Sequence, residues 1–127
     1  MRFIEVSPRG YSQSVEIDNG ISKTIIISGQ VPLNSKGEIV GLNDLEKQTE
    51  KVFENIQALI EKSGGSMKDL VNIDCYFTDI SKISEFRKAR DKFINLQNPP
   101  ASTAVQVERL VNPDFLIEIN AMAVVNH

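Results

Sequence analysis

The chain has 127 residues, of which 41% are hydrophobic and 24% are charged, and its formal net charge is -3. This length suits one domain with a single core (residues 1–127), and the acidic balance provides no positive field for nucleic acid or for an anionic membrane surface. The lone Cys75 excludes an internal disulfide, and the N-terminus has no apolar signal core, so we expect a cytoplasmic protein.

The first half of the chain is predicted to form strands and then a long helix. Three strands are expected, at residues 2–6, 11–18 and 23–33. Asn19-Gly20 is a strong turn signal between the second and the third, and residues 34–38 are expected to form a loop. The third strand is apolar at consecutive positions, from Ile25 to Ile27, which predicts that both of its faces are buried.

Residues 43–63 carry the clearest helical pattern, since apolar residues recur there at three- and four-residue spacing. The stripe consists of Leu45, Val52, Phe53, Ile56, Leu59 and Ile60. Asn43 with Glu46 resembles a capping box, and Gly64-Gly65 is expected to cap the C-terminal end. Residues 66–69 are expected to cap one further turn.

The second half adds a strand, a helix and two more strands. Residues 71–78 alternate, with Val71, Ile73, Cys75 and Phe77 facing one way. A second helix is predicted over residues 81–96 from the apolar face of Ile83, Phe86, Phe93 and Ile94, and it must end before Pro99-Pro100. The last strands are expected at residues 102–110 and 115–125, separated by a turn over 111–114.

The resulting order, β-β-β-α-β-α-β-β, predicts an α+β sheet with both helices on one face. The strands "TIIIS" (24–28) and "AMAVV" (121–125) have apolar residues at consecutive positions, so the opposite face is apolar as well. Two helices cover only one face. A symmetric homo-oligomer is the simplest way to bury the other.

Signatures of familiar catalytic sites are absent from the sequence: we find no nucleophile motif, phosphate loop, dinucleotide fingerprint or metal-spaced His/Cys cluster, and we expect neither a metal nor a cofactor. The only histidine, His127, is the last residue and is interpreted as a frayed end. Cys75 lies on an apolar strand face and is interpreted as a buried thiol.

Three weaker signals remain, and each has an ordinary structural alternative. Tyr11 opens a strand, where it is either a ligand contact or a common strand aromatic. Gly29, in "SGQ" (28–30), either lets a ligand or another backbone approach closely or relieves a bulge. Glu118 and Asn120 share one face of the final strand, as candidate site residues or as a solvated face.

Together these stretches resemble the RidA/YjgF/YER057c/UK114 family, also called endoribonuclease L-PSP. The resemblance covers nearly the whole chain, and its markers are "YSQSV" (11–15), "IISGQVPLN" (26–34), the block 45–81, "PPASTAVQV" (99–107) and "IEINAMAVV" (117–125). It implies a chorismate-mutase-like fold assembled as a homotrimeric barrel with ligand clefts between subunits. It also implies hydrolysis of enamine/imine intermediates to 2-keto acids.

The resemblance assigns roles only to residues that match the family pattern. Tyr11, Ser28 and Gly29 match cleft positions, and Glu118 matches the glutamate that positions the attacking water. The family arginine that grips the substrate carboxylate follows Pro-Ala at the start of a strand, where this chain has Ser102 followed by Thr103. The cysteine common two positions later is Ala104, and the loop before the prolines is shorter than in typical deaminases. This chain therefore resembles the members that lack the deaminase arginine.

Arg90, on the predicted second helix, is a candidate replacement for that arginine, with a solvated helix face as the alternative; Arg109 is a weaker candidate. Three functions stay open at this point. The chain is a deaminase-like hydrolase with an altered site, a trimer that binds a small carboxylate, imine or keto-acid metabolite or a protein without turnover, or a ribonuclease, which the acidic charge disfavours.

Overall fold

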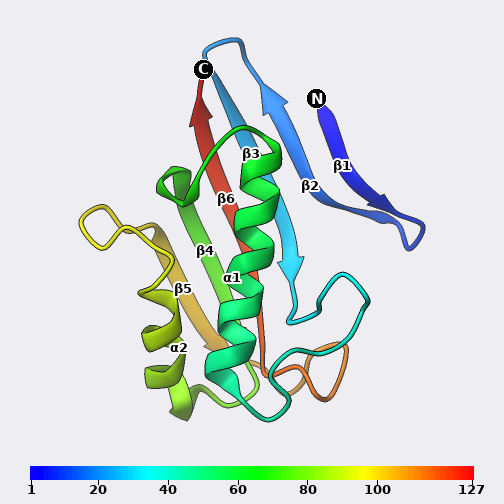
Figure 1. The fold of residues 1–127 in the computed structure, drawn as a ribbon, viewed down its shortest axis with the longest axis vertical. Coiled ribbons are helices and arrows are strands. Elements are labelled where there is room, and N and C mark those ends of the chain that lie inside the picture. The colour runs from blue at the N-terminus through cyan, green and yellow to red at the C-terminus, as the bar shows by residue number, and fades with distance from the viewer.

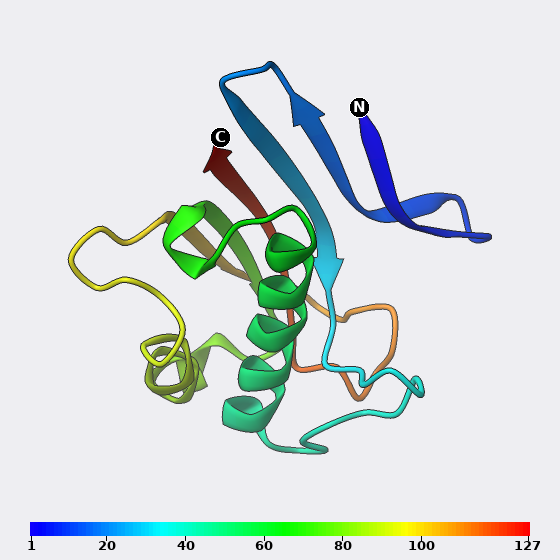
Figure 2. The same cartoon turned by 45° about the horizontal axis from the view of Figure 1, so that its top comes forward.

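Six strands form one sheet in the order β1-β2-β3-β6-β4-β5 in a computed structural model that describes residues 1–127 (Figure 1). The strands are β1 Arg2–Ser7, β2 Tyr11–Asp18, β3 Ser22–Gln30, β4 Leu70–Phe77, β5 Ala101–Gln106 and β6 Ile117–Asn126. All neighbouring strands are antiparallel except β4 and β5, which are parallel. The helices α1 (Leu45–Lys62) and α2 (Ile83–Arg90) both lie on one face (Figure 2), which confirms the predicted element order and the α+β class.

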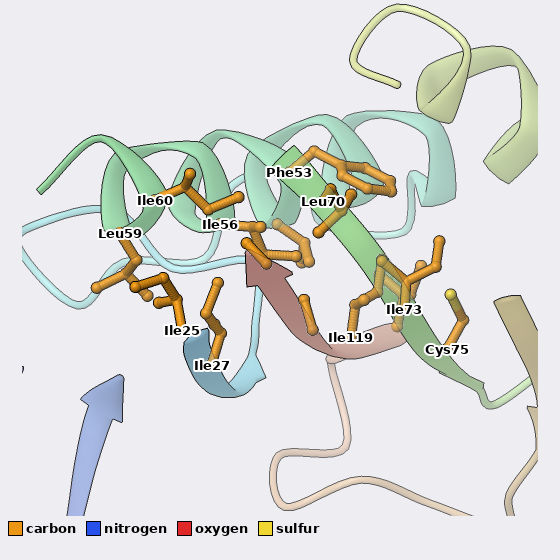
Figure 3. Close-up of a cluster of buried hydrophobic side chains, with 14 of the residues drawn as sticks. Ile25, Ile27, Phe53, Ile56, Leu59, Ile60, Leu70, Ile73, Cys75 and Ile119 are labelled. Atoms are coloured by element: carbon orange, nitrogen blue, oxygen red, sulfur yellow. The ribbon is translucent and has the colours of Figure 1, made fainter. Parts of the chain in front are cut away.

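The core lies between α1 and the central strands. The helix contributes Val52, Phe53, Ile56 and Ile60, all without solvent exposure, and they face buried residues of β3, β4 and β6 such as Ile25, Ile73 and Ile119 (Figure 3). An aromatic cluster attaches α2: Phe86 meets Phe77 edge-on at 5.0 Å, and Phe93 stacks on Phe53 at 5.5 Å. Neither helix has the length and apolar composition required to cross a bilayer.

The start of α1 differs from the prediction. Asp44, not Asn43, is the N-cap: its backbone is extended (φ -131°, ψ 97°), and its carboxylate accepts a hydrogen bond from the Lys47 N–H. Asn43 has φ +58°, a left-handed conformation in which it cannot serve as the cap. The predicted capping box of Asn43 with Glu46 is therefore not formed, and this prediction is wrong.

The other end of α1 follows the prediction. The N–H groups of Gly64 and Gly65 donate to the carbonyls of Glu61 and Ile60, at 3.0 and 3.1 Å, and Gly64 has φ +84°. This is the glycine-dependent reverse turn that commonly ends helices. The following turn, Met67–Asp69, has the expected cap, since Ser66 and Asp69 bond to each other's backbone.

The second helix is shorter than the predicted 81–96. A turn of 3-10 helix (Ile80–Lys82) precedes α2, and after Arg90 the N–H groups of Lys92 and Phe93 bond to carbonyls three residues back, at Ala89 and Arg90. Further on, the Asn95 side chain accepts bonds from the next backbone N–H groups and competes with helix formation. Phe93 and Ile94 are thus partly buried, as predicted, but they lie in a turn after α2 and not in the helix.

Several strand boundaries also differ. Val71 is exposed and does not share the buried face of Ile73 and Cys75 as predicted, because the β4–β6 pairing is irregular between Leu70 and Asn72 and turns Leu70 inward instead. β3 ends at Gln30, not at residue 33, and Pro32 just beyond it has no N–H with which to continue a ladder. β5 ends at Gln106, not at residue 110.

The sheet face opposite the helices is open in the single chain. Ile26 and Met122 face each other across β3 and β6 on this side, and they are 44% and 37% exposed. The predicted imbalance, in which two helices cover one face of a sheet that is apolar on both, is therefore confirmed.

Replacement of Gln48 by leucine is expected to destabilise the protein. Gln48 is fully buried, donates to the carbonyls of Gly41 and Asp114 and accepts from the Leu116 N–H. Buried groups left unpaired cost about 1–3 kcal/mol each, so we expect a loss of about 3 kcal/mol in urea unfolding. Gln57→Leu, on the same helix but bonded only to the exposed Glu61, is the control. Equal losses for both variants would contradict this role.

Candidate functional site

A bulge in β3 shapes the open face of the sheet. Ile27 pairs with Ala121 and Gln30 with Ile119, so Ser28 and Gly29 together lie opposite Asn120. The Ser28 hydroxyl donates to the Ser12 carbonyl at 2.6 Å, which ties the bulge to β2. The bulge thus opens the β3–β6 ladder at the two residues that the sequence had singled out.

Glu118 lies directly against Gly29. A Cβ on Gly29 would lie 2.4 Å from the Glu118 Oε2, so a residue with a side chain at position 29 would displace the carboxylate. The bulge alternative for Gly29 is therefore confirmed, and the missing side chain also permits the close approach of the Glu118 carboxylate. Glu118 alternates with the buried Ile117 and Ile119 and so faces the open side of the sheet.

The Glu118 carboxylate is partly removed from water and has no compensating partner. It makes no hydrogen bond or ion pair within the chain, and burial raises its pKa above the usual range. A carboxyl group with a raised pKa exchanges protons closer to neutral pH than an ordinary glutamate does. This chemistry fits a group that orients water or transfers a proton.

Asn120, which the sequence paired with Glu118, has a different environment. Its amide donates to the Asp74 carboxylate at 3.0 Å, and Asn72 donates to the same carboxylate oxygen at 3.4 Å. Asn120 therefore belongs to a polar cluster on β4 and β6 that is satisfied internally. Glu118 is the free member of the pair.

Tyr11 and Gly29 line a second feature, a groove of 590 Å³ beside α1. It lies between the N-terminal strands, the end of β3 and the following loop, and one side of α1. Its lining comprises Glu5, Tyr11, Gln13, Gly29, Gln30, Val31, Leu33, Asn34, Ser35, Lys51, Asn55, Ala58, Leu59 and Lys62. Glu118 is not part of this lining, so the groove and the carboxylate contact Gly29 from different directions.

The predicted carboxylate-binding region at the start of β5 lies apart from these residues. Ser102, Thr103 and Ala104 are exposed on an edge strand and pair with residues of β4. Two strands, β6 and β4, separate β5 from β3. At the usual spacing between strands this corresponds to about 14 Å, so one chain does not bring Ser102 to Gly29.

Arg90 is held on the helix side of the sheet. Its guanidinium bonds to the Asp91 carboxylate through Nε at 2.9 Å and Nη2 at 2.8 Å, and it lies 5.6 Å from the centre of the Phe86 ring. The Asp91 carboxylate largely neutralises its charge within the chain. Arg109 is exposed, and its Nε donates only to the Leu110 carbonyl at 3.3 Å.

The structure shows the surroundings of Cys75 and of His127. Cys75 is buried, which confirms the predicted buried thiol, and burial raises its pKa to about 12, so little reactive thiolate is present near neutral pH. The interpretation of His127 as a frayed end is wrong, because its ring bonds to the Asp18 carboxylate at 2.8 Å and its backbone N–H bonds to the Ile21 carbonyl at 3.1 Å.

Lys51 and its neighbours in the groove were missed by the sequence analysis. Lys51, Asn55, Ala58 and Lys62 recur at spacings of four, three and four residues, so they form a second stripe of α1 beside the apolar one. The helical spacing of these four residues is readable from the sequence. A polar stripe on a helix is normally exposed to solvent, however, and only the position of the N-terminal strands in the structure shows that this one borders a groove.

Comparison with known proteins gives consistent matches over nearly the whole chain. The family model "Endoribonuclease L-PSP" matches residues 5–125. A RutC family protein of Pyrococcus abyssi is 34% identical over 95% of this chain and 93% of its own. Among solved structures, RidA from an Antarctic Psychrobacter species superposes with a TM-score of 0.83 at 30% identity, covering 96% and 94% of the two chains. E. coli TdcF with bound serine superposes with a TM-score of 0.78 at 28% identity, and the match covers 96% of this chain and 91% of the TdcF chain.

Glu118→Gln is expected to change how stability depends on pH. Because the pKa of Glu118 is raised on folding, the folded state holds its proton more tightly, and stability falls as pH rises from about 4.5 through the folded pKa. We expect the glutamine variant to have a higher Tm than the wild type at pH 7 but a similar Tm at pH 4. Glu108→Gln, at an exposed position, is the control, and a Tm difference that is the same at both pH values would refute the assignment.

Proposed function

Since the chain belongs to the endoribonuclease L-PSP family, which includes the RidA/YjgF proteins, we propose that it is a cytoplasmic homotrimer with small-molecule clefts between its subunits. The ligands are small metabolites of the enamine/imine or 2-keto acid type. The observation that carries this proposal is the unpaired Glu118 carboxylate, packed against Gly29 on an uncovered sheet face.

The separation of the candidate residues within one chain supports assembly of the cleft from two chains. Gly29 and Glu118 lie at the centre of the sheet, whereas Ser102 lies on its exposed edge strand. A neighbouring copy that places its β5 edge near Glu118 would complete the cleft. The same association would bury Ile26 and Met122, whose exposure has a cost in a single chain.

Deaminase activity in this cleft is weak or absent, because Ser102 stands where the family arginine would grip the substrate carboxylate. Charge-assisted hydrogen bonds contribute about 1.5–3 kcal/mol each, so their loss corresponds to about 10- to 100-fold or more in productive binding. Arg90 is a poor substitute within the chain, since it is already bonded to Asp91.

A trimer that binds a metabolite without turnover is the second candidate. It is favoured by the same Ser102 and by the similarity to TdcF, whose structure holds serine, a small amino acid with a carboxylate. Glu118 distinguishes the two functions: a hydrolase requires its carboxylate to orient water, whereas a binding protein does not.

The trimer is tested by sedimentation equilibrium. We expect a mass of three subunits of 14.2 kDa at micromolar concentration, because the open sheet face is apolar. Ile26→Lys is expected to weaken the assembly by placing a charge on that face, whereas Lys36→Met on the exposed loop leaves it unchanged. A stable wild-type monomer at the same concentration would overturn this part of the proposal.

Ser102→Arg is expected to raise imine deaminase activity from a low or undetectable level. The assay generates 2-iminobutanoate with threonine dehydratase and follows the release of 2-ketobutyrate. The new guanidinium would supply the missing carboxylate contact, and the gain should appear mainly in kcat/KM. Rescue is expected to be partial, since Ala104 and the short loop before the prolines also depart from the deaminase pattern.

The double variant Ser102→Arg/Glu118→Ala is the matched control and should lose the gain. If it stays as active as the single variant, Glu118 does not have the proposed role. If the single variant is trimeric but no more active than the wild type, the missing arginine does not explain the difference from the deaminases.

A further inference from the structure

We propose that the groove beside α1 is a separate binding site for a small carboxylate with a short aliphatic body, and that the Lys51 ammonium is its anion-binding group. The groove shares Tyr11 and Gly29 with the cleft positions that the family resemblance implies, but it goes beyond the proposed function because Glu118 and Ser102 are not part of its lining. Its volume of 590 Å³ lies within the range of small-molecule sites.

The walls of the groove are held in place by specific contacts. Asn55, one turn after Lys51 on α1, donates from its amide to the carbonyls of Val31 and Leu33, at 3.1 and 3.0 Å. These two bonds fix the loop after β3 against the helix. On the opposite wall, the Gln30 amide donates to the Gln13 side-chain oxygen at 2.9 Å. The groove is therefore formed by the folded chain itself.

The charges in the groove leave one positive group poorly neutralised. Lys62 forms an ion pair with Glu5 across the groove, so each of these two charges already has a direct partner among the lining residues. Lys51 is only 22% exposed, and its one ion pair is with Glu54 at 3.5 Å, whose side chain is 54% exposed and lies outside the lining. Solvent-exposed pairs of this spacing are weak, so Lys51 is available to a stronger anionic partner.

The other lining groups define the rest of the ligand. Val31, Leu33, Ala58 and Leu59 form an aliphatic wall that suits a short hydrocarbon body. The Gln13 amide N–H groups and the hydroxyls of Tyr11 and Ser35 have no partner in the chain and can bond a polar substituent. One lysine beside apolar side chains matches a monocarboxylate better than a phosphate, which needs several cationic donors.

The test is a titration of the isotope-labelled full chain with butyrate, followed by NMR of backbone amides. We expect shifts at Leu33, Ser35 and Asn55, which line only the groove, and at least about tenfold weaker binding in Lys51→Met, in line with the loss of one charge-assisted bond. Lys47→Met is the matched control, since Lys47 is exposed one turn earlier on α1 and does not line the groove. Its affinity for butyrate should equal that of the wild type.

Four further arms of the experiment address other sources of binding. Butyramide, a neutral analogue, should bind much more weakly than butyrate, and inorganic phosphate should not compete with it. Ala58→Trp, at an exposed position on the groove wall, should block butyrate without changing any charge, so the test holds even if Lys51→Met misfolds. Glu118→Ala should leave butyrate binding intact.

Four results would overturn the inference. Butyramide binds as tightly as butyrate, phosphate displaces butyrate, Lys51→Met and Ala58→Trp both bind like the wild type, or Glu118→Ala abolishes binding. The last result would locate butyrate in the cleft that contains Glu118, and it would support the proposed function while refuting the groove. Conversely, intact butyrate binding in a chain whose Ser102→Arg variant stays inactive would refute the proposed chemistry alone.

Discussion

The burial of α1 on one face of the sheet is the interaction on which the other features depend. Its apolar stripe occupies the side of β3, β4 and β6 that carries Ile25, Ile73 and Ile119. Because side chains alternate along a strand, this choice sends Glu118 and Met122 to the opposite face. α1 also places its second stripe, with Lys51, beside the N-terminal strands. The open face and the groove therefore both follow from the orientation of one helix.

The bulge at Ser28-Gly29 then connects these two regions. It adds a residue to β3, and the glycine leaves room for the Glu118 carboxylate on one side while its backbone lines the groove on the other. A side chain at position 29 would require the Glu118 carboxylate to move. A substitution of Gly29 is therefore expected to disturb the site more than the fold.

Local patterns predicted most of the elements and only part of the site. The stripe and the glycine cap of α1 were readable because helical periodicity and left-handed turns are local properties. The second helix was predicted too long, since Phe93 packs on Phe53 from a turn that mimics helical spacing. Gly29 and Glu118 were each identified, but their contact depends on strand register, and the distance to Ser102 depends on β5 joining the edge of the sheet in parallel to β4. These are long-range pairings that no local pattern contains.

Net charge and local charge lead to different conclusions about ligands. A formal charge of -3 argues against a nucleic acid, which contacts a large surface and responds to the summed field. A small anion inside a groove responds to the charges within a few ångströms, because exposed charges farther away than about 8–10 Å are screened by salt. In this groove Lys62 already pairs with the nearby Glu5, whereas the mostly buried Lys51 has only the exposed Glu54 as a partner and is the positive group of the proposed site. An acidic protein can therefore still contain a site for an acid.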